Sequence, residues 1–556
     1  MEVAVGYDGG GLALAVVTGD GVEEPRRIDP ERLPELPELL ESLGAPLAEV
    51  RWIWADTKAI YPRLLAAGVR VERCHDLRLC HAILAGHAPA LAADSRWQRH
   101  EIAESEPTLL DDQPSESRVE LTEVVAEYVR QRQHVVHDPG RDDQERIRRA
   151  KLRLLLSAES AGALVAAEMA YHGLPWDVAV HDQQLTELLG PRPRFGGRPD
   201  KLQAVADRMI TELGVGSFNP DSPVELLQSL HRAGINVEST RKWELERIDH
   251  PAIEPLLEYK KLSRLLSANG WTWLDSWVKH GRFRPDYVVG GVVTGRWATN
   301  GGGALQLPKQ IRSAAKADPG WKLVVADASQ LEPRVLAAMA GDDQLASAAR
   351  GHDLYQGLVD AGVVDTRAHA KGAMLGALYG ATTGFGGQLM PRLIKAYPRA
   401  TGVVEQAARD GEQGAVVSTF LGRRSPEASA SWRELQQLAG SGEASAEEAR
   451  RARQWARDWG RFTRNFVVQG TAAEWALCWM ARLRQTLVDQ GQDGARPHLV
   501  YFLHDEVIVH SPIDCADRVA ELIMDAAAQA GRLLFGDSGV EFALQIAIVD
   551  DYGQAK

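Results

Sequence analysis

The chain has 556 residues, of which 45% are hydrophobic and 25% are charged. This length exceeds what one hydrophobic core supports, so we expect two to four domains. The formal net charge of −13 does not favour nucleic-acid binding, although a local basic face is sufficient for it. Four cysteines without metal-ligand spacing indicate a reducing cytoplasm. The sequence predicts neither a signal peptide nor a membrane span.

The first 90 or so residues alternate short apolar runs with helical stretches, which predicts a small α/β domain. Its strand-like runs are Val3–Tyr7, Leu12–Val17 and Val50–Trp54. The polar segment 92–118 is typical of a loop. From about 145 to 280 the pattern is helical, apart from a Gly/Pro/Arg-rich loop at 190–199.

Strand-like segments return at 283–327 and again at 498–549, on either side of a mostly helical stretch at 344–480. The arrangement predicts one sheet assembled from distant parts of the chain. An Ala/Glu/Arg-rich segment at 440–464 is expected to be a surface helix.

The first candidate metal ligand is Asp327, which follows the apolar run Leu323–Ala326. Read alone, Asp327 could cap the next helix, and Ser329 with Glu332 fits a capping box. Pro333 favours a helix that begins near Glu332, which would leave both acids in the connection.

The second candidate is Asp505, within His504-Asp505-Glu506 between two apolar runs. The pattern predicts a hairpin with acids at its tip, and a polar turn explains either acid alone. Asp327 and Asp505 together offer the carboxylates that hold two Mg²⁺ ions roughly 3.5–4 Å apart.

Between these acids, Arg367, Lys371, Leu375 and Tyr379 recur at a spacing of four. This spacing places them on one slowly winding face of a helix. The cations could bind a triphosphate, and Leu375 and Tyr379 could pack against a base and sugar. An ordinary amphipathic helix with a basic end stays open as the alternative.

These motifs, in this order from about Glu159 onward, resemble family A DNA polymerases of the DNA polymerase I type. The segment Asp327–Arg334 is similar to the first palm motif of the family, and His504-Asp505-Glu506 is similar to its last. Arg367, Lys371 and Tyr379 match the fingers helix. Further matches are Thr294–Arg296, Leu305, Gln306, Pro308, Arg461, Asn465 and Gln469–Ala473.

The resemblance implies a multidomain α/β and α+β protein: an RNase H-like N-terminal domain, then a right-hand polymerase with thumb, palm and fingers. It is large-fragment-like, with no 5′-nuclease domain expected. The implied ranges are 1–145 for a 3′–5′ exonuclease-like domain, 146–281 for the thumb, 282–343 for the first part of the palm, 344–465 for the fingers and 466–556 for the second part of the palm.

The resemblance also implies residue roles. Asp327 and Asp505 would hold two Mg²⁺ ions, for which Mn²⁺ could substitute, with Glu506 as a secondary acid. Arg367 and Lys371 would bind the triphosphate and act in catalysis. The dNTP site would add Gln330, Glu332, Leu375 and Tyr379. The DNA-binding residues would be Arg296, Gln306, Arg461, Asn465, Gln469 and His504.

The sequence departs from the family at Leu375, where an aromatic ring is usual, and at Ala328 and Pro333. We therefore expect an active polymerase with changed kinetics or sugar discrimination. The alternatives are a polymerase that accepts rNTPs, a DNA-binding scaffold without catalysis, and an exonuclease without polymerase activity.

In the N-terminal domain Asp8 and Asp56 match vestigial exonuclease acids, whereas Gly10 and Ile60 stand where further acids belong. Asp76 is not an expected ligand. We therefore expect no effective proofreading. The expected partners are primer-template DNA and dNTPs. A monomer is expected, without membrane contact, in the cytoplasm and at the nucleoid if the source is bacterial, with a role in DNA repair or replication.

Overall fold

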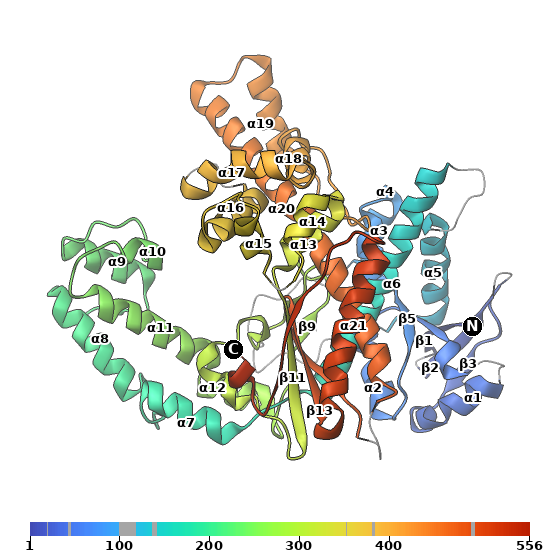
Figure 1. Ribbon diagram of the computed structural model, residues 1–556. Helices are drawn as coiled ribbons and strands as arrows, with labels where there is room; N and C mark the ends of the chain where they lie inside the picture. Colours follow the sequence, from blue (N-terminus) through green and yellow to red (C-terminus); the bar gives the residue numbers. More distant parts are fainter. Residues whose placement is uncertain are drawn as a thin grey trace. The chain divides into compact units, whose positions relative to one another are not determined.

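The computed structural model describes residues 1–9, 11–18, 21–42, 46–98, 118–135, 142–351, 353–380, 384–490 and 495–555 (Figure 1). Gly10 and most of the loop expected at 92–118 lie outside these residues. Contacts divide the chain into two compact units. The first comprises 1–172, 286–300 and 324–548, and the second comprises 173–285, 301–323 and 549–556.

The first unit begins with a sheet whose described strands lie in the order β3-β2-β1-β4-β5. β1 pairs antiparallel with β2, and β2 with β3, whereas β1-β4 and β4-β5 are parallel. The three predicted strands are confirmed. Because β1 and β2 are buried on both faces, their sequences are continuous apolar runs. The strands are β1 (Glu2–Asp8), β2 (Gly11–Val17), β3 (Arg26–Ile28), β4 (Arg51–Trp54) and β5 (Arg73–Asp76).

Two helices of the N-terminal region, α2 and α3, follow strands of this sheet and start at capping acids. Asp56 caps α2 by accepting from the Lys58 N–H, and Asp76 caps α3 by accepting from the Leu79 N–H. The helices are α1 (Leu36–Ser42), α2 (Thr57–Ala66), α3 (Leu77–Ala85), α4 (Pro89–Ala92) and α5 (Leu121–Val135).

Helix α6 (Asp143–His172) is the one helix of the described residues long and apolar enough to cross a membrane. Of the 18-residue apolar stretch of this helix, 61% is buried inside the fold. It packs against α2, β5, α20 (Ala446–Leu487) and β12 (His498–Leu503). Core packing therefore accounts for its apolar composition.

The other sheet of this unit follows the order β12-β13-β11-β14. Its strands are β11 (Trp321–Ala328), β12, β13 (Glu506–Pro512) and β14 (Leu544–Val549), so the prediction of one sheet built from distant segments is confirmed. Helix α21 (Ala516–Phe535) packs against β13 and α20. Two short paired strands, β9 (Tyr287–Val288) and β10 (Ala298–Thr299), lie beside β12 through the Tyr287 hydroxyl, which donates to the Phe502 carbonyl at 2.7 Å.

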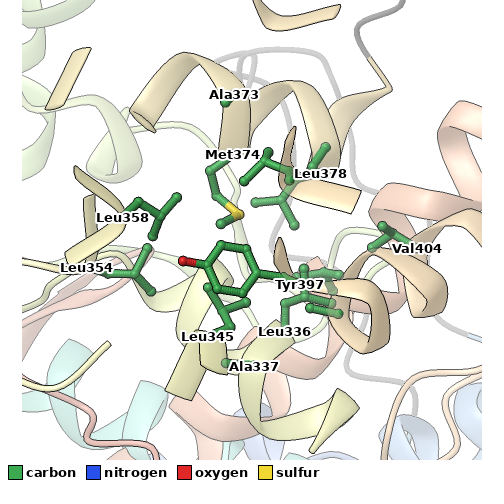
Figure 2. Close-up of a cluster of buried hydrophobic side chains, with 14 of the residues drawn as sticks. Leu336, Ala337, Leu345, Leu354, Leu358, Ala373, Met374, Leu378, Tyr397 and Val404 are labelled. Atoms are coloured by element: carbon green, nitrogen blue, oxygen red, sulfur yellow. The ribbon is translucent and has the colours of Figure 1, made fainter. Parts of the chain in front are cut away.

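The helical stretch between β11 and β12 encloses a hydrophobic core of its own, shown in Figure 2. Met374 and Leu378 pack there with Leu336, Leu354 and Tyr397. The helices are α13 (Leu331–Ala340), α14 (Asp343–Ala348), α15 (Leu354–Asp360), α16 (Arg367–Tyr379), α17 (Gly384–Ala396), α18 (Pro398–Glu412), α19 (Ala430–Ser441) and α20.

The helix predicted to begin near Glu332 is confirmed, since α13 begins at Leu331, but the expected place of the two acids is wrong. Asp327 belongs to β11, and Glu332 lies in the first turn of α13 rather than in the connection. The connection is short because Gln330 takes a left-handed φ of 49°, which turns the chain within one residue. The surface helix predicted at 440–464 is confirmed for most of its length, because α20 begins at Ala446 and most of its residues up to Arg464 are exposed or half-buried; the helix then continues to Leu487, 42 residues in all.

The second unit is mostly helical, which confirms the prediction for 145–280. Helix α8 packs against α11, and the loop predicted at 190–199 joins α7 to α8. A small sheet in the order β6-β8-β7 adjoins them. The elements are β6 (Leu174–Pro175), α7 (Val178–Leu189), α8 (Asp200–Leu213), α9 (Pro223–Arg232), α10 (Lys242–Leu245), α11 (Ile253–Asn269), α12 (Trp271–Trp277), β7 (Val278–Lys279) and β8 (Arg282–Phe283).

Candidate active site

The structure brings Asp327 and Asp505 together from distant parts of the chain. Asp327 is the penultimate residue of β11, and Asp505 lies in the two-residue turn that joins β12 to β13. The Ala328 N–H donates to the Asp505 carbonyl oxygen at 2.9 Å. Both acids are partly exposed, whereas the strand residues before Asp327 are buried. Two carboxylate-bearing residues are therefore neighbours at one end of the sheet.

The predicted hairpin is confirmed, and its tip is strained. His504 has a φ of 58°, and the Asp505 N–H donates to the Leu503 carbonyl at 2.7 Å, which closes a three-residue turn. A left-handed conformation in a residue other than glycine costs on the order of 1–3 kcal/mol and is typical of functional sites. Burial lowers the pKa of His504, and the nearby Arg296 charge lowers it further. His504 is therefore neutral at pH 7.

The donor set fits a hard divalent cation. Mg²⁺ prefers carboxylate oxygens, and is commonly held by one or two carboxylates together with substrate phosphates and water. Among the described residues, no group of three or more His, Cys, Asp or Glu side chains is arranged to hold a metal ion. Asp327 and Asp505 are carboxylates at this end of the sheet that could hold such an ion. Glu506 is fully buried at the start of β13.

The helix predicted around 367–380 is α16, which Thr366 caps by accepting from the His369 N–H at 3.2 Å. Arg367, Lys371 and Tyr379 are exposed and Leu375 is half-buried, so all four lie on one accessible face. The opposite face carries Ala370, Ala373, Met374, Ala377 and Leu378 into the core of Figure 2. A side chain at Gly372 would meet open space, so close packing of protein does not explain that glycine.

Arg367 forms an ion pair that the sequence did not predict. Its Nε donates to Asp353 Oδ2 at 2.6 Å, and its guanidinium lies 5.7 Å from the centre of the Tyr355 ring. The hydrogen bond and charge of Asp353 raise the pKa of Arg367. Burial favours the neutral form of Asp353, but the Arg367 hydrogen bond and the capped N–H groups outweigh it and lower the pKa of that carboxyl. Both groups are charged at pH 7.

Gln330, predicted to bind dNTP, joins β11 to the start of α15. Its Oε1 accepts from the Leu354 N–H at 3.1 Å, and its Nε2 donates to Asp353 Oδ1 at 3.5 Å. Gln330 therefore lies between the turn that follows Asp327 and the acid that pairs with Arg367.

Glu332 connects two other predicted site residues. One carboxylate oxygen accepts from Arg296, and the other accepts from the Tyr379 hydroxyl at 2.8 Å. Burial, the Glu332 charge and this hydrogen bond together raise the pKa of Tyr379 to about 12. The phenol therefore keeps its proton and donates to Glu332, which fixes the carboxylate beside the end of α16.

The candidate DNA-binding residues of α20 share one face. Arg461, Asn465 and Gln469 are four residues apart, and all are exposed or half-buried. Arg461 pairs with Asp458 one turn earlier, and Gln469 lies against Tyr379. Gln306 belongs to the second unit, where its Oε1 accepts from Arg264 at 3.0 Å.

Sequence reasoning did not anticipate the contacts of two buried arginines, Arg334 and Arg423. Arg334 is 1% exposed and donates to the carbonyls of Ser329, Ala349, Gly351 and Glu541. It thus holds the start of α13 against two loops. Arg423 donates to the buried Glu159 at 2.7 Å. The sequence offered two signals for Arg334, its place at the end of the motif Asp327–Arg334 and its position inside an apolar helical run.

In the N-terminal region, the acids expected to be remnants of an exonuclease site have protein partners. Asp8 pairs with Arg27 at 3.2 Å, and Asp56 caps α2. Asp76 is buried and accepts from the Thr57 N–H and hydroxyl. Burial and the nearby Asp56 charge raise the pKa of Asp76 to about 6. Ile60 is buried in α2.

Comparison with known proteins assigns the family. The profile of DNA polymerase family A matches residues 198–553. DNA polymerase I of Chloroflexus aurantiacus is 28% identical over 382 residues, which are 63% of this chain and 37% of that protein. The thermostable DNA polymerase I of Thermus thermophilus is 27% identical over 418 residues, 68% of this chain and 45% of that protein. The chain belongs to DNA polymerase family A.

The curated relatives are longer than the part that matches, since the chain spans less than half of the length of either. Among solved structures, the polymerase domain of Pol1 from M. smegmatis, in complex with DNA primer-template and dNTP, matches with a TM-score of 0.70. The match covers 100% of this chain and 95% of that one at 20% identity. At this identity the likeness establishes the fold alone.

Proposed function

We propose that this protein is a DNA-directed DNA polymerase that extends a primer 3′ end with dNTPs. The observation that carries the proposal is that Asp327 and Asp505 are neighbours at one end of the sheet, where the N–H of Ala328, next to Asp327, donates to the Asp505 carbonyl. The exposed face of α16 that carries Arg367 and Lys371 belongs to the same compact unit as Asp327 and Asp505. Family membership supports this assignment.

In the proposed mechanism Asp327 and Asp505 would hold two Mg²⁺ ions, with Mn²⁺ as a possible substitute. When bound, the ions would supply Lewis-acid activation of the primer hydroxyl and neutralise charge on the phosphates. Arg367 and Lys371 bind the triphosphate and stabilise the leaving pyrophosphate. Arg296, Arg461, Asn465, Gln469 and His504 contact the primer-template, as does Gln306 of the second unit.

We also propose the subdomains implied by the family: an exonuclease-like domain at 1–145, a thumb at 146–281, a palm at 282–343 and 466–556, and fingers at 344–465. The strand order β3-β2-β1-β4-β5, in which two neighbouring pairs are antiparallel and two are parallel, supports an RNase H-like N-terminal domain. The enzyme acts as a cytoplasmic monomer in repair or replication.

The test of this proposal is primer extension on a recessed primer-template, with dNTPs or rNTPs and with Mg²⁺ or Mn²⁺. Template-directed extension with dNTPs supports it. DNA binding without extension under every condition would instead support the scaffold alternative.

Glu332 is proposed to exclude ribonucleotides by crowding the sugar 2′ position. Replacing Glu332 with Ala opens that space, and we expect rNTP use relative to dNTP use to rise about 10- to 100-fold, the range for one steric contact in a pocket. Relative kcat/KM values for the two sugars measure the effect. Tyr379→Phe is the matched control: it removes the hydroxyl that holds Glu332 but keeps the carboxylate. Tyr379→Phe should raise rNTP use less than Glu332→Ala does. Equal increases in the two variants would contradict crowding of the sugar by the Glu332 carboxylate itself.

We expect no effective proofreading. The acids Asp8 and Asp56 are engaged with Arg27 and the α2 cap, and Ile60 is apolar, so Mg²⁺ would lack ligands there. Gel assays of a labelled primer without dNTPs should detect no 3′-end trimming in Mg²⁺ or Mn²⁺. Robust trimming that Asp8→Ala abolishes would contradict this expectation.

A further inference from the structure

We propose that Asp353 restrains Arg367 in the nucleotide-free protein, and that an incoming triphosphate must displace this carboxylate to reach the arginine. The inference rests on the proposed function, because it takes Arg367 as a triphosphate-binding residue. It assigns to Asp353 a positioning role that sets the apparent affinity for the nucleotide.

The two carboxylate oxygens of Asp353 have different partners. Oδ1 caps α15 by accepting from the N–H groups of Tyr355 at 3.0 Å and Gln356 at 3.3 Å. Oδ2 accepts from Arg367 Nε at 2.6 Å. The cap fixes the acid to the helix, so Asp353 cannot follow Arg367 when the arginine moves.

A second contact fixes the same acid from the metal-binding side. Gln330 lies three residues after Asp327, and its side-chain amide bonds both Asp353 and the Leu354 N–H. The Tyr355 ring lies below the guanidinium. Asp353 is thus held from two sides, whereas Arg367 is 54% exposed on the accessible face of α16.

The electrostatic consequence is competition between two anions for one cation. A triphosphate that binds Arg367 must break the pair and then lies near an uncompensated carboxylate, which repels it. An ion pair of this exposure corresponds to a factor of about two to five in an equilibrium constant. The restraint therefore weakens nucleotide binding without preventing it.

Asp353→Asn tests the restraint, because asparagine is as good a helix cap as aspartate but carries no charge. We expect the KM for dNTP to fall about two- to five-fold while kcat changes less than about twofold. Asp353→Glu, which keeps the charge, should retain a KM near that of the unmodified protein. Asp360→Asn is the matched control: it removes one charge from the exposed end of the same helix and should leave KM unchanged.

Binding of inorganic tripolyphosphate to the protein without DNA gives a reading independent of polymerase activity. The expected result is two- to five-fold tighter binding by the Asp353→Asn protein, about the ratio for one exposed pair. If extension fails but this tightening is observed, the proposed function is wrong and the restraint stands. If extension is robust but Asp353→Asn leaves KM unchanged or raises it, the restraint is wrong, since Asp353 would then orient Arg367 productively. Unchanged or weaker tripolyphosphate binding would also overturn it.

Discussion

Asp327→Asn should abolish primer extension, with a loss of about 10³-fold or more in kcat. The substitution keeps the size and the strand position of the side chain but removes the charge that holds a divalent cation. Metal ions supply several kcal/mol of transition-state stabilisation, and about 4 kcal/mol corresponds to a factor of about 10³. Single-turnover extension at saturating dNTP and Mg²⁺ measures the loss.

The matched control for this experiment is Asp343→Asn. Asp343 begins α14 and is almost fully exposed beside Arg399. It should extend primers at the unmodified rate, and both variants should bind primer-template DNA because neither substitution removes a basic residue. Extension by Asp327→Asn at more than about one tenth of the unmodified rate would refute the proposed metal role.

Arg484→Met should destabilise the protein by about 3–5 kcal/mol, as expected when one partner of a buried ion pair is removed. Arg484 of α20 donates to both carboxylate oxygens of Glu168 in α6, at 2.9 and 2.6 Å. It also donates to the Tyr61 hydroxyl at 3.2 Å and to the Glu72 carbonyl at 3.1 Å. The Arg484 and Glu168 side chains are 3% and 12% exposed, so the substitution leaves a largely buried carboxylate with Arg70, at 3.3 Å, as its remaining ion-pair partner among the described residues.

Equilibrium denaturation followed by circular dichroism measures this effect, with Arg518→Met as the control. Arg518 pairs with Glu521 on the exposed surface of α21 and should change stability little. Adding Glu168→Gln to Arg484→Met should recover part of the lost free energy of unfolding, because the buried negative charge of Glu168 is then removed. A loss no larger than that of the control would show that the cluster contributes nothing measurable.

The same cluster predicts how stability changes with pH. Burial opposes the charge on Glu168, but Arg484 and Arg70 outweigh it and lower the pKa of the carboxyl below its ordinary 4.5. A lowered pKa means that the unfolded chain binds the proton more readily than the folded protein. The contribution of Glu168 is therefore fully present above about pH 4.5 and is lost as the pH falls through the folded pKa.

The clusters around Asp353 and Arg484 differ in what they do for the site. Arg484 joins α20 to α6 and to Tyr61 of α2, so it ties the N-terminal region to the polymerase core. Asp353 instead holds an exposed arginine that is proposed to move. Burial decides the difference: a buried pair acts mainly on stability, whereas an exposed pair is weak enough for a ligand to displace.

The sequence by itself determined the local elements and the chemistry they carry. Short apolar runs predicted the strands of the N-terminal sheet, and a spacing of four predicted that Arg367, Lys371, Leu375 and Tyr379 share a face. The order of the motifs identified the family. These features are encoded within a few turns or one strand, where backbone geometry fixes which side chains share a face.

The tertiary structure alone decided which distant residues meet. The pairing of Ala328 with Asp505, the bonds of Glu332 to Arg296 and Tyr379, and the ion pair of Arg367 with Asp353 join separate elements. Such contacts depend on the order of strands in the sheet and on how the helices pack, and local periodicity specifies neither. The left-handed conformation of Gln330 likewise decided that Glu332 lies in α13 rather than in the connection. One residue's backbone conformation sets where the strand ends and where the helix begins.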